Sequence, residues 1–225
     1  CNNRKDFVKL QGLKDSIASL RSVLIAFSGG VDSTLLLKIA HEVLKERVVA
    51  VTVSSPLYPA RETQQAKKLA ARLGVRHIII EHDPLANSAV VENSPKRCYW
   101  CKKELFQLLA ELARQQGCAC VVDGTNYDDL QDFRPGAQAA RECGVRSPLQ
   151  EAGLTKKEIR ALSRTFDLST WDKPSLACLA SRFPYGIRIT REALERVAAA
   201  EEILLDCGFR QLRVRHHGET ARIEV

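Results

Sequence analysis

The sequence predicts an α/β protein with a doubly wound parallel sheet and a small C-terminal α+β lobe. Short apolar runs alternate with segments whose apolar residues recur at helical spacing, which is typical of parallel strands joined by crossover helices. A glycine pair, Gly29–Gly30, follows the first apolar run. Beyond Pro148 this alternation ends, and helical segments, a proline-containing loop and a final alternating stretch follow. These observations indicate one main sheet domain with a short appended lobe.

The elements of the main domain follow from this pattern in chain order. Short apolar runs that end at turn residues are typical of parallel strands buried on both faces. Gly74 and Gly117 occupy positions where glycine commonly ends a helix. Strands are therefore expected at residues 22–27, 48–53, 77–80 and 118–122, and helices from Ser33 onward and at 61–73 and 103–116.

The C-terminal part is expected to form a lobe of its own. Apolar spacing predicts helices at 156–164 and 191–207, with a loop rich in proline and small residues at 172–186. Residues 212–225 alternate in the manner of a hairpin. We place the boundary between the two parts near residue 185. The expected domains are 1–185 and 186–225.

Composition narrows the class of protein and of ligand. The 225 residues are 45% hydrophobic and 27% charged, and no apolar run approaches the roughly 20 residues that span a bilayer. The first residues lack the pattern of a secretory signal, so we expect a cytoplasmic protein without membrane contact. The net charge of +7 suits an anionic ligand such as a nucleotide or RNA. Eight cysteines in a reducing compartment are expected to be thiols or ligands of a metal or cluster.

The loop after the first strand, Ser28 to Ser33, has the features of a phosphate-binding site. A loop that follows a strand and opens a helix presents unpaired backbone amides at the positive end of the helix dipole. Glycines let the backbone approach phosphate oxygens, serine hydroxyls add donors, and Asp32 can orient Mg²⁺ or an amide. The lysine of a Walker-type loop is absent, which disfavours transfer of a γ-phosphate. A tight turn at the glycine pair is the structural alternative.

A second polar segment, Asp123–Asp129, follows the last apolar run of the main domain. Parallel strands end at the same edge of a sheet, where open α/β folds bind ligands, so we expect this segment to lie beside the first loop. A structural Asn/Asp/Gly turn is the alternative.

The first loop, in its strand–loop–helix context, resembles the SGGxDS loop of the PP-loop ATP pyrophosphatases. The resemblance implies the fold of that superfamily, which is like that of the adenine nucleotide alpha hydrolases. It also implies that the loop grips the pyrophosphate end of ATP, with Mg²⁺, while the α-phosphorus is attacked to give an adenylated substrate. The residues expected to bind ATP or pyrophosphate are Ala26, Ser28, Gly29, Gly30, Asp32, Ser33, Gly124 and Asn126.

Three cysteines form a second group of candidate residues. Cys98 and Cys101 are a Cys-x-x-Cys pair flanked by basic residues, and nearby cations favour the thiolate that attacks electrophiles and binds metals. Cys178, in the loop before the C-terminal lobe, is the third. A zinc site completed by Cys118 and Cys120 is the alternative, although both begin an apolar strand, where small buried cysteines are common. Core positions are expected for Cys143 and Cys207.

The chain also resembles the LarE family, whose members build the sulfur groups of the nickel-pincer nucleotide cofactor. The resemblance covers nearly the whole chain and is carried by residues 28–33, 124–129, 134–136, 171–186 and 212–219. It implies that ATP adenylates a carboxylate of a pyridinium dicarboxylate mononucleotide and that sulfur then displaces AMP to give a thiocarboxylate. It also implies a homo-oligomer that receives sulfur from sulfide or a cysteine desulfurase.

Two branches of that family deliver sulfur differently. One branch sacrifices the sulfur of a single cysteine at the position of Cys178, and the other holds a [4Fe-4S] cluster on three cysteines. The sequence resembles the second branch, with Cys98, Cys101 and Cys178 as the ligands. Three thiolates leave one iron of the cube free for an exchangeable sulfide, whereas a fourth would close the cluster.

Further residues are expected around the substrate. The family resemblance implies that Ser181 lies near the reacting centre, so it joins the three cysteines as a catalytic candidate. Guanidinium groups bind phosphate and carboxylate in bidentate fashion, so Arg182, Arg213 and Arg215 are expected to bind substrate, with a solvated basic face as the alternative. Trp100 either stacks on the pyridinium ring or fills a hydrophobic gap. A secondary metal or subunit contact is implied for Glu201 and Glu224.

Other functions remain open from the sequence alone. A tRNA thiolase of the same superfamily would also adenylate a carbonyl oxygen, and the basic charge favours it, but no basic stripe interleaved with aromatic residues is present for stacking bases. An ammonia-using ligase of the superfamily would need no cysteines. A nucleotide sensor would bind ATP without releasing pyrophosphate. We expect a small-molecule nucleotide substrate and no nucleic acid.

Overall fold

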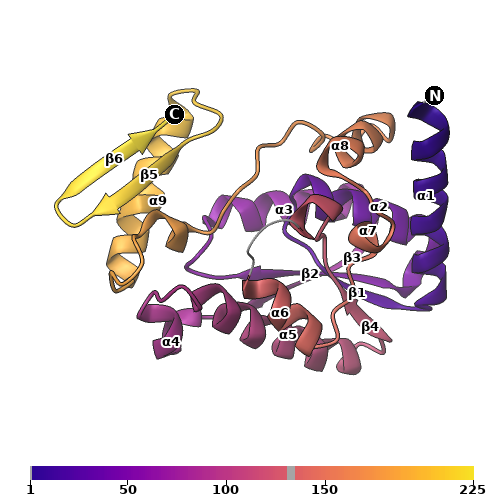
Figure 1. Ribbon diagram of the computed structural model, residues 1–225, viewed down its shortest axis with the longest axis horizontal. Coiled ribbons are helices and arrows are strands. Elements are labelled where there is room, and N and C mark those ends of the chain that lie inside the picture. Colours follow the sequence, from indigo (N-terminus) through magenta and orange to yellow (C-terminus); the bar gives the residue numbers. More distant parts are fainter. Residues whose placement is uncertain (1, 131–134) are drawn as a thin grey trace.

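The computed structural model describes residues 2–130 and 135–225, and at its centre lies a four-stranded parallel sheet (Figure 1). All three neighbouring strand pairs are parallel, in the order β3-β2-β1-β4. The predicted α/β class is confirmed, and the strands lie close to the expected positions. Their bounds are β1 Val23–Ala26, β2 Val48–Ser54, β3 Arg76–Glu81 and β4 Cys120–Val122.

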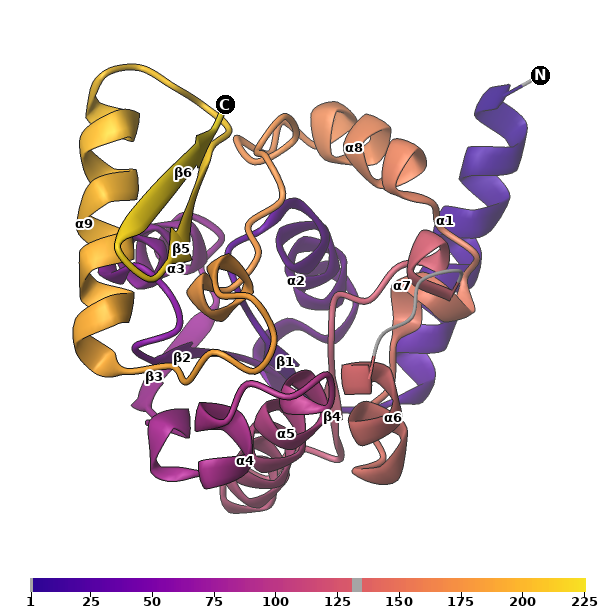
Figure 2. The ribbon, with the colours of Figure 1, turned by 60° about the vertical axis from the view of Figure 1, so that its left-hand side comes forward.

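Helices cover both faces of this sheet (Figures 1 and 2). The longer helices are α1 Asn2–Ser19, α2 Val31–Leu44, α3 Ala60–Arg72, α5 Arg97–Gln115, α6 Pro135–Glu142, α8 Lys156–Thr165 and α9 Arg191–Asp206. Single turns are α4 Ser88–Val91 and α7 Pro148–Glu151, with 3-10 turns η1 Lys45–Arg47, η2 Pro84–Ala86, η3 Tyr127–Leu130 and η4 Leu179–Arg182. No helix in the described part of the chain is long and apolar enough to cross a membrane.

The two faces of the sheet belong to two different hydrophobic cores. Successive strand side chains point to opposite faces, so neighbouring residues of β1 enter different cores. Ile25 packs in the core that α1, α2 and α8 cover, whereas Leu24 packs with Phe106 of α5. Both faces are therefore buried, which explains why the strands read as continuous apolar runs rather than alternating ones.

Two helices differ from the expectations. Helix α5 begins at Arg97 instead of near residue 103, so Cys98 and Cys101 lie in its first turns. Helix α1 was not among the expected elements, and Leu13 and Ile17 bury one side of it in the first core. In both cases tertiary packing determines the helix more than the local pattern does.

The C-terminal lobe consists of α9 and an antiparallel hairpin, β5 Arg213–His217 and β6 Thr220–Glu224, at the opposite end of the molecule from α1 (Figure 1). A third hydrophobic core lies beneath it. Leu57 and Phe183 from the main domain pack there with Ile189 and Leu194. The division into 1–185 and 186–225 remains a prediction, because this core contains residues from both sides of it.

Strand β1 lies between β2 and β4, so the chain leaves β1 toward one side of the sheet and later returns to its other side. Ligands of open α/β sheets bind where the strand order reverses in this way, at the carboxyl ends of the strands. The segments that follow β1 and β4 both lie at this point. We call residues 28–33 the glycine loop, and residues 172–186, which connect α8 to the C-terminal lobe, the cysteine loop.

Candidate active site

The glycine loop has a backbone that only glycine fits at its tightest point. Gly29 has φ +69°, and a Cβ atom there would lie 3.2 Å from the Cα of Ala66 on α3. Gly30 then takes the N-cap position of α2 in an extended conformation, and no side chain of the described residues caps the helix. The first amides of α2 are left for a ligand, and the helix dipole favours an anion there.

Hydroxyl groups flank these amides. The hydroxyls of Ser28 and Ser33 lie 3.1 Å apart, Ser33 Oγ donates to Gly30 O at 3.3 Å, and Gly30 N–H donates to Ser28 Oγ at 3.4 Å. These contacts are long, so an incoming oxyanion can replace them at small cost. Ala26, the last residue of β1, lies just below the loop and adds no polar side chain.

The turn after β4 touches the glycine loop directly. A Cβ atom on Gly124 would lie 3.0 Å from the backbone nitrogen of Ser33, so the close approach depends on glycine. Asn126 is buried, and its Nδ2 donates to Asp32 Oδ1 at 3.2 Å. The turn is also held by its own hydrogen bonds, including Thr125 Oγ1 to Asp123 at 2.8 Å. The turn therefore lies beside the glycine loop, as expected, and it is also a structural turn held by its own hydrogen bonds. Contact of this turn with ATP remains a prediction.

Two lysines reach the glycine loop, and sequence reasoning missed both. Lys156, the first residue of α8, forms an ion pair with Asp32. Lys173, in the cysteine loop, donates to Gly29 O at 3.2 Å and pairs with Glu62 of α3 at 2.8 Å. Neither lies near the loop in sequence, and no motif of the Walker type marks them. Both of these cations come to the glycine loop from the second half of the chain.

A chain of hydrogen bonds supports the residue before the glycine loop. Thr52 Oγ1 donates to the carbonyl of Phe27 at 2.7 Å, so the same oxygen accepts from His77 Nε2, 2.8 Å away. Burial, with a smaller contribution from Lys67, holds the pKa of His77 below its ordinary value. The neutral imidazole is therefore favoured, and its Nε2–H tautomer makes this hydrogen bond.

The structure brings the three candidate cysteines into one region. Cys98 and Cys101 lie in the first turns of α5, and Cys178 caps η4 in the cysteine loop. Burial, opposed by Lys102 and assisted by Cys178 and Cys98, raises the pKa of Cys101 to about 11. Tyr58, which the sequence did not single out, also has a pKa above its usual range, through burial first and then the same three thiols. Cys101 and Cys178 also pack against the same hydrophobic core, and Cys98 precedes Cys101 by three residues on α5.

Arg97 joins the helix that carries Cys98 to the cysteine loop. Its side chain is 4% exposed, donates to Asn93 Oδ1 and to Ala180 O at 2.9 Å, and lies 3.7 Å from Cys98 Sγ. The ring of Tyr185 lies 5.7 Å from the guanidinium. Within the described ranges Arg97 pairs with no carboxylate. Burying a cation without a counter-charge is costly, so this position fits an anionic group at the thiols.

Arg182 holds the cysteine loop from its other side. The buried guanidinium binds the carboxylate of Glu201 at 2.8 and 3.1 Å, and donates to Cys178 O at 3.2 Å and Ser181 Oγ at 2.9 Å. Glu201 also accepts from the backbone N–H of Val214 at 2.9 Å. The expected contact of Arg182 with substrate stays a prediction, since a ligand would have to displace these partners. In the structure, Arg182 instead holds Cys178 and Ser181 in position.

The remaining candidates lie toward the hairpin. Arg215 pairs with Glu224 at 2.9 Å and donates to Ser181 O at 3.1 Å. Arg213 is exposed and belongs to no ion pair in the described part of the chain. Trp100 is 39% exposed, and its ring lies 5.0 Å from that of Tyr99 at a steep angle, so its two expected roles stay predictions.

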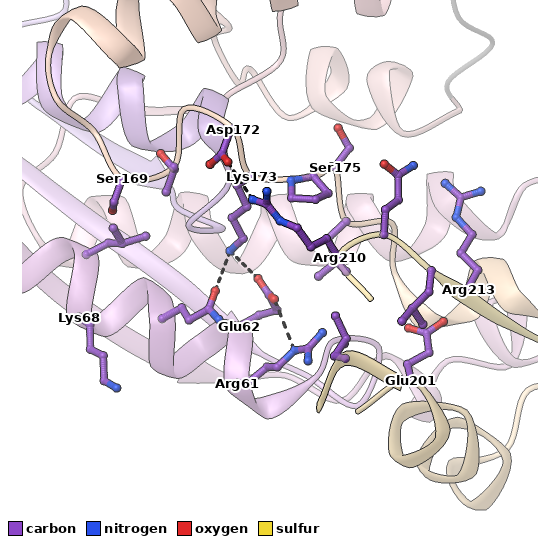
Figure 3. A pocket seen from close by; sticks show the side chains of 18 of the residues that line it. Arg61, Glu62, Lys68, Ser169, Asp172, Lys173, Ser175, Glu201, Arg210 and Arg213 are labelled. Atoms are coloured by element: carbon purple, nitrogen blue, oxygen red, sulfur yellow. Dashed lines mark hydrogen bonds and ion pairs between the residues drawn. The ribbon is translucent and has the colours of Figure 1, made fainter. Parts of the chain in front are cut away.

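A cleft of about 520 Å³ opens between α3, the start of the cysteine loop and the hairpin (Figure 3). Lys173 and Glu62 line it on one side, and Glu201 and Arg213 on the other. The thiols and residues 28–33 are not among the residues that line it. The cleft nevertheless adjoins both, because Lys173 reaches the glycine loop and Arg182, another lining residue, reaches the loop of Cys178.

The described residues do not form the alternative zinc site. In the described residues no three His, Cys, Asp or Glu side chains are arranged to hold a single metal ion. Cys118 and Cys120 pack in the second and first cores, away from the third core that Cys101 and Cys178 contact, so they do not complete a zinc site. A cluster does not require thiols to meet at one point, because each thiolate binds a different iron.

Two further expectations can be compared with the structure. Cys143 packs against the second core as expected, but Cys207 is exposed, so its core assignment was wrong. It follows α9 at the C-cap, beyond the buried stripe of that helix. Arg134, part of the stretch 134–136, lies outside the described residues.

Comparisons with known proteins agree with this geometry. A family model described as NAD synthase matches residues 2–111. An uncharacterized protein of Synechocystis sp. is 46% identical over 217 residues, 96% of this chain and 81% of that protein. The pyridinium-3,5-bisthiocarboxylic acid mononucleotide synthase of Lactiplantibacillus plantarum is 40% identical over 93% of this chain and 76% of its own length. A tRNA-specific 2-thiouridylase of Rickettsia felis is 26% identical over 68% of this chain and 52% of that protein.

Proposed function

The chain belongs to the family of pyridinium-3,5-bisthiocarboxylic acid mononucleotide synthases, the LarE family of ATP-dependent PP-loop sulfurtransferases, and we propose that it inserts sulfur into a pyridinium dicarboxylate mononucleotide. One structural observation carries the proposal beyond family membership. The short segment from Lys173 to Cys178 contacts the glycine loop at one end and supplies the third thiol at the other. An ATP-activating site and a sulfur-delivering site therefore adjoin in one chain.

The first step in this proposal activates a carboxylate. A carboxylate is a poor electrophile, so its oxygen attacks the α-phosphorus of ATP, the bond between the α- and β-phosphates breaks, and an acyl-adenylate and pyrophosphate form. The amides at Gly30 and the start of α2 hold the departing pyrophosphate, and the hydroxyls of Ser28 and Ser33 add donors. Mg²⁺, when bound, neutralises pyrophosphate charge, and Asp32 is the carboxylate placed to orient it.

The second step exchanges oxygen for sulfur. Sulfur adds to the acyl carbon, the bond from that carbon to the AMP oxygen breaks, and AMP leaves with the electron pair. Cys98, Cys101 and Cys178 would hold a [4Fe-4S] cluster, which would supply the sulfide. Arg97 provides a fixed positive charge beside Cys98, and Arg182 holds the Cys178 loop and Ser181 in place. A sacrificial version, in which Cys178 itself attacks, remains the alternative for sulfur delivery.

Substrate recognition is proposed for the basic groups near the hairpin. Arg213, which is exposed and unpaired among the described residues, and Arg215, which lies beside Ser181, suit the phosphate and the remaining carboxylate. The exposed indole of Trp100 suits stacking on a cationic ring. We also propose that the protein works as a homo-oligomer in the cytoplasm and is resupplied with sulfur by sulfide or a cysteine desulfurase.

Iron and acid-labile sulfide analysis after anaerobic purification tests the cluster. The proposal predicts about four irons and as much sulfide per chain, lost in Cys98→Ala and retained in Cys143→Ala, whose thiol lies in the second core. Stoichiometric zinc without sulfide would contradict it. One sulfur lost per chain during turnover, with no iron present, would favour the sacrificial version.

A tRNA thiolase is the second candidate function, because of the basic charge and the similarity to a tRNA-specific 2-thiouridylase. Binding of tRNA by a basic face would weaken steeply with salt. A gel shift with purified protein at low and moderate salt distinguishes the two functions. We expect no specific tRNA shift, and sulfur transfer to tRNA would contradict the proposed substrate.

A further inference from the structure

Lys173 occupies a position that the reaction described above does not explain. Its ammonium group has three N–H donors. They meet Glu62 Oε2 at 2.8 Å and Gln65 Oε1 at 2.9 Å (Figure 3), and Gly29 O at 3.2 Å. The side chain is therefore fully partnered by protein atoms from the glycine loop and from α3.

The contact with Gly29 fixes a peptide rather than a side chain. In a planar trans peptide, the carbonyl of one residue and the N–H of the next point in opposite directions. Holding Gly29 O on the Lys173 side therefore directs the N–H of Gly30 to the other side, where it meets Ser28 Oγ. A peptide between two glycines rotates easily without such a contact. Lys173 thus keeps an anion-binding amide turned toward the ligand position.

The stretch from Lys173 to Cys178 is held by backbone hydrogen bonds at both of its ends. Arg160 donates to Trp171 O at 2.7 Å and to Lys173 O at 2.8 Å, so the start of the cysteine loop is anchored. The backbone N–H of Leu179, the residue after Cys178, donates to Leu57 O at 2.8 Å. Lys173 and Cys178 therefore lie near the two anchored ends of one short stretch of chain.

We propose that Lys173 is a positioning residue that holds the glycine loop in its anion-binding form and couples that loop to the position of Cys178. The coupling part rests on the function proposed above, whereas the loop part requires only that the loop binds pyrophosphate. The competing explanation is that Lys173 merely neutralises Glu62, whose side chain is largely buried.

Variants at positions 173 and 62 separate these explanations. Lys173→Met removes the contact with Gly29 and leaves the largely buried Glu62 with only its longer ion pair to Arg61, at 3.8 Å. It is therefore expected to lower the unfolding temperature and weaken pyrophosphate binding about tenfold, as expected for loss of one well-placed contact. Adding Glu62→Gln removes this poorly paired carboxylate. The double variant is expected to recover thermal stability but not pyrophosphate affinity. Lys173→Arg, which retains a donor and the charge, is expected to keep most of the affinity.

The experiment is calorimetry with magnesium pyrophosphate, together with thermal unfolding, on these variants and on Lys157→Met as a control for loss of one exposed lysine. A double variant that binds pyrophosphate as wild type does would overturn the proposal. Coupling is read from turnover at saturating ATP, where Lys173→Met is expected to lower thiocarboxylate formed per pyrophosphate released. An unchanged ratio would overturn the coupling. Wild-type protein that binds pyrophosphate but forms no thiocarboxylate would contradict the proposed function, and the binding data would still decide the role of Lys173.

Discussion

The glycine loop takes its shape from six consecutive residues, whereas the three-cysteine group is assembled from two segments far apart in the chain. In the loop, backbone conformation creates the site, and Gly29 makes it possible. At the thiols, buried side chains create the site, since Arg97 and Arg182 tie the cysteine loop to α5 and α9. The two sites should therefore be sensitive to different substitutions. The glycine loop should be disrupted by changes that alter its backbone, and the thiol site by changes that leave a buried charge unpaired.

The largest expected effect separates the chemistry of the two regions. Cys178→Ala is expected to abolish thiocarboxylate formation while ATP is still converted to pyrophosphate, because the glycine loop is unchanged. Pyrophosphate and the sulfur-containing product would be measured in the same reaction. Cys143→Ala, in the second core, serves as the control. Full formation of the sulfur-containing product by Cys178→Ala would contradict a role of Cys178 in sulfur delivery.

The next largest effect tests the buried charges of the thiol region. Arg182→Met leaves Glu201 as an unpaired buried carboxylate, so we expect a loss of about 3–5 kcal/mol in the free energy of unfolding. The double variant with Glu201→Leu is expected to recover a large part of this loss. Denaturant titration measures both, with the exposed Arg114→Met as a control expected within about 0.5 kcal/mol of wild type. Equal losses in single and double variants would show that the ion pair does not hold the loop.

A smaller effect tests the backbone of the glycine loop. Gly29 and Gly74 both have left-handed backbones, with φ of +69° and +68°, but only Gly29 has an atom in the way of a Cβ. Alanine at either position is expected to cost about 1 kcal/mol of strain. Gly29→Ala adds a clash with Ala66, so it should be the more destabilising variant and should weaken pyrophosphate binding. Equal behaviour of the two variants would contradict the close packing of the loop on α3.

The smallest effect is a pH dependence beneath the glycine loop. Because the pKa of His77 is lowered in the folded protein, the unfolded chain takes up a proton first as pH falls through about 6.5. Stability is therefore complete above that pH and decreases below it, levelling off beneath the folded pKa. Urea midpoints between pH 8 and 5 would show this slope, and His77→Gln should reduce it. An equal pH dependence of the urea midpoint in wild type and His77→Gln would show that His77 does not cause it.

The sequence predicted the glycine loop and the central sheet well, because both depend on local signals. Residues 28–33 are contiguous, and each strand is a short apolar run. Neighbouring residues in the sequence therefore determine both features. The three cysteines were also expected, from their spacing and from family resemblance, and the structure places them in one region.

What the sequence could not show are the contacts that cross the chain. Lys156 and Lys173 reach the glycine loop from the second half of the chain, and nothing in their local pattern distinguishes them from surface lysines. Arg182 was expected to bind substrate, but its partner Glu201 became evident only when α9 was packed against the cysteine loop. Such pairings depend on tertiary packing, which a local pattern does not encode.

The most direct test of the account is one turnover reaction with its products measured together. Purified protein, loaded anaerobically, would be given ATP and a pyridinium dicarboxylate mononucleotide, and AMP, pyrophosphate and the mass of the mononucleotide would be followed. The account predicts AMP and pyrophosphate in equal amounts, and a mononucleotide whose mass increases by the difference between sulfur and oxygen. Formation of ADP, or of AMP with no sulfur in the mononucleotide, would contradict it.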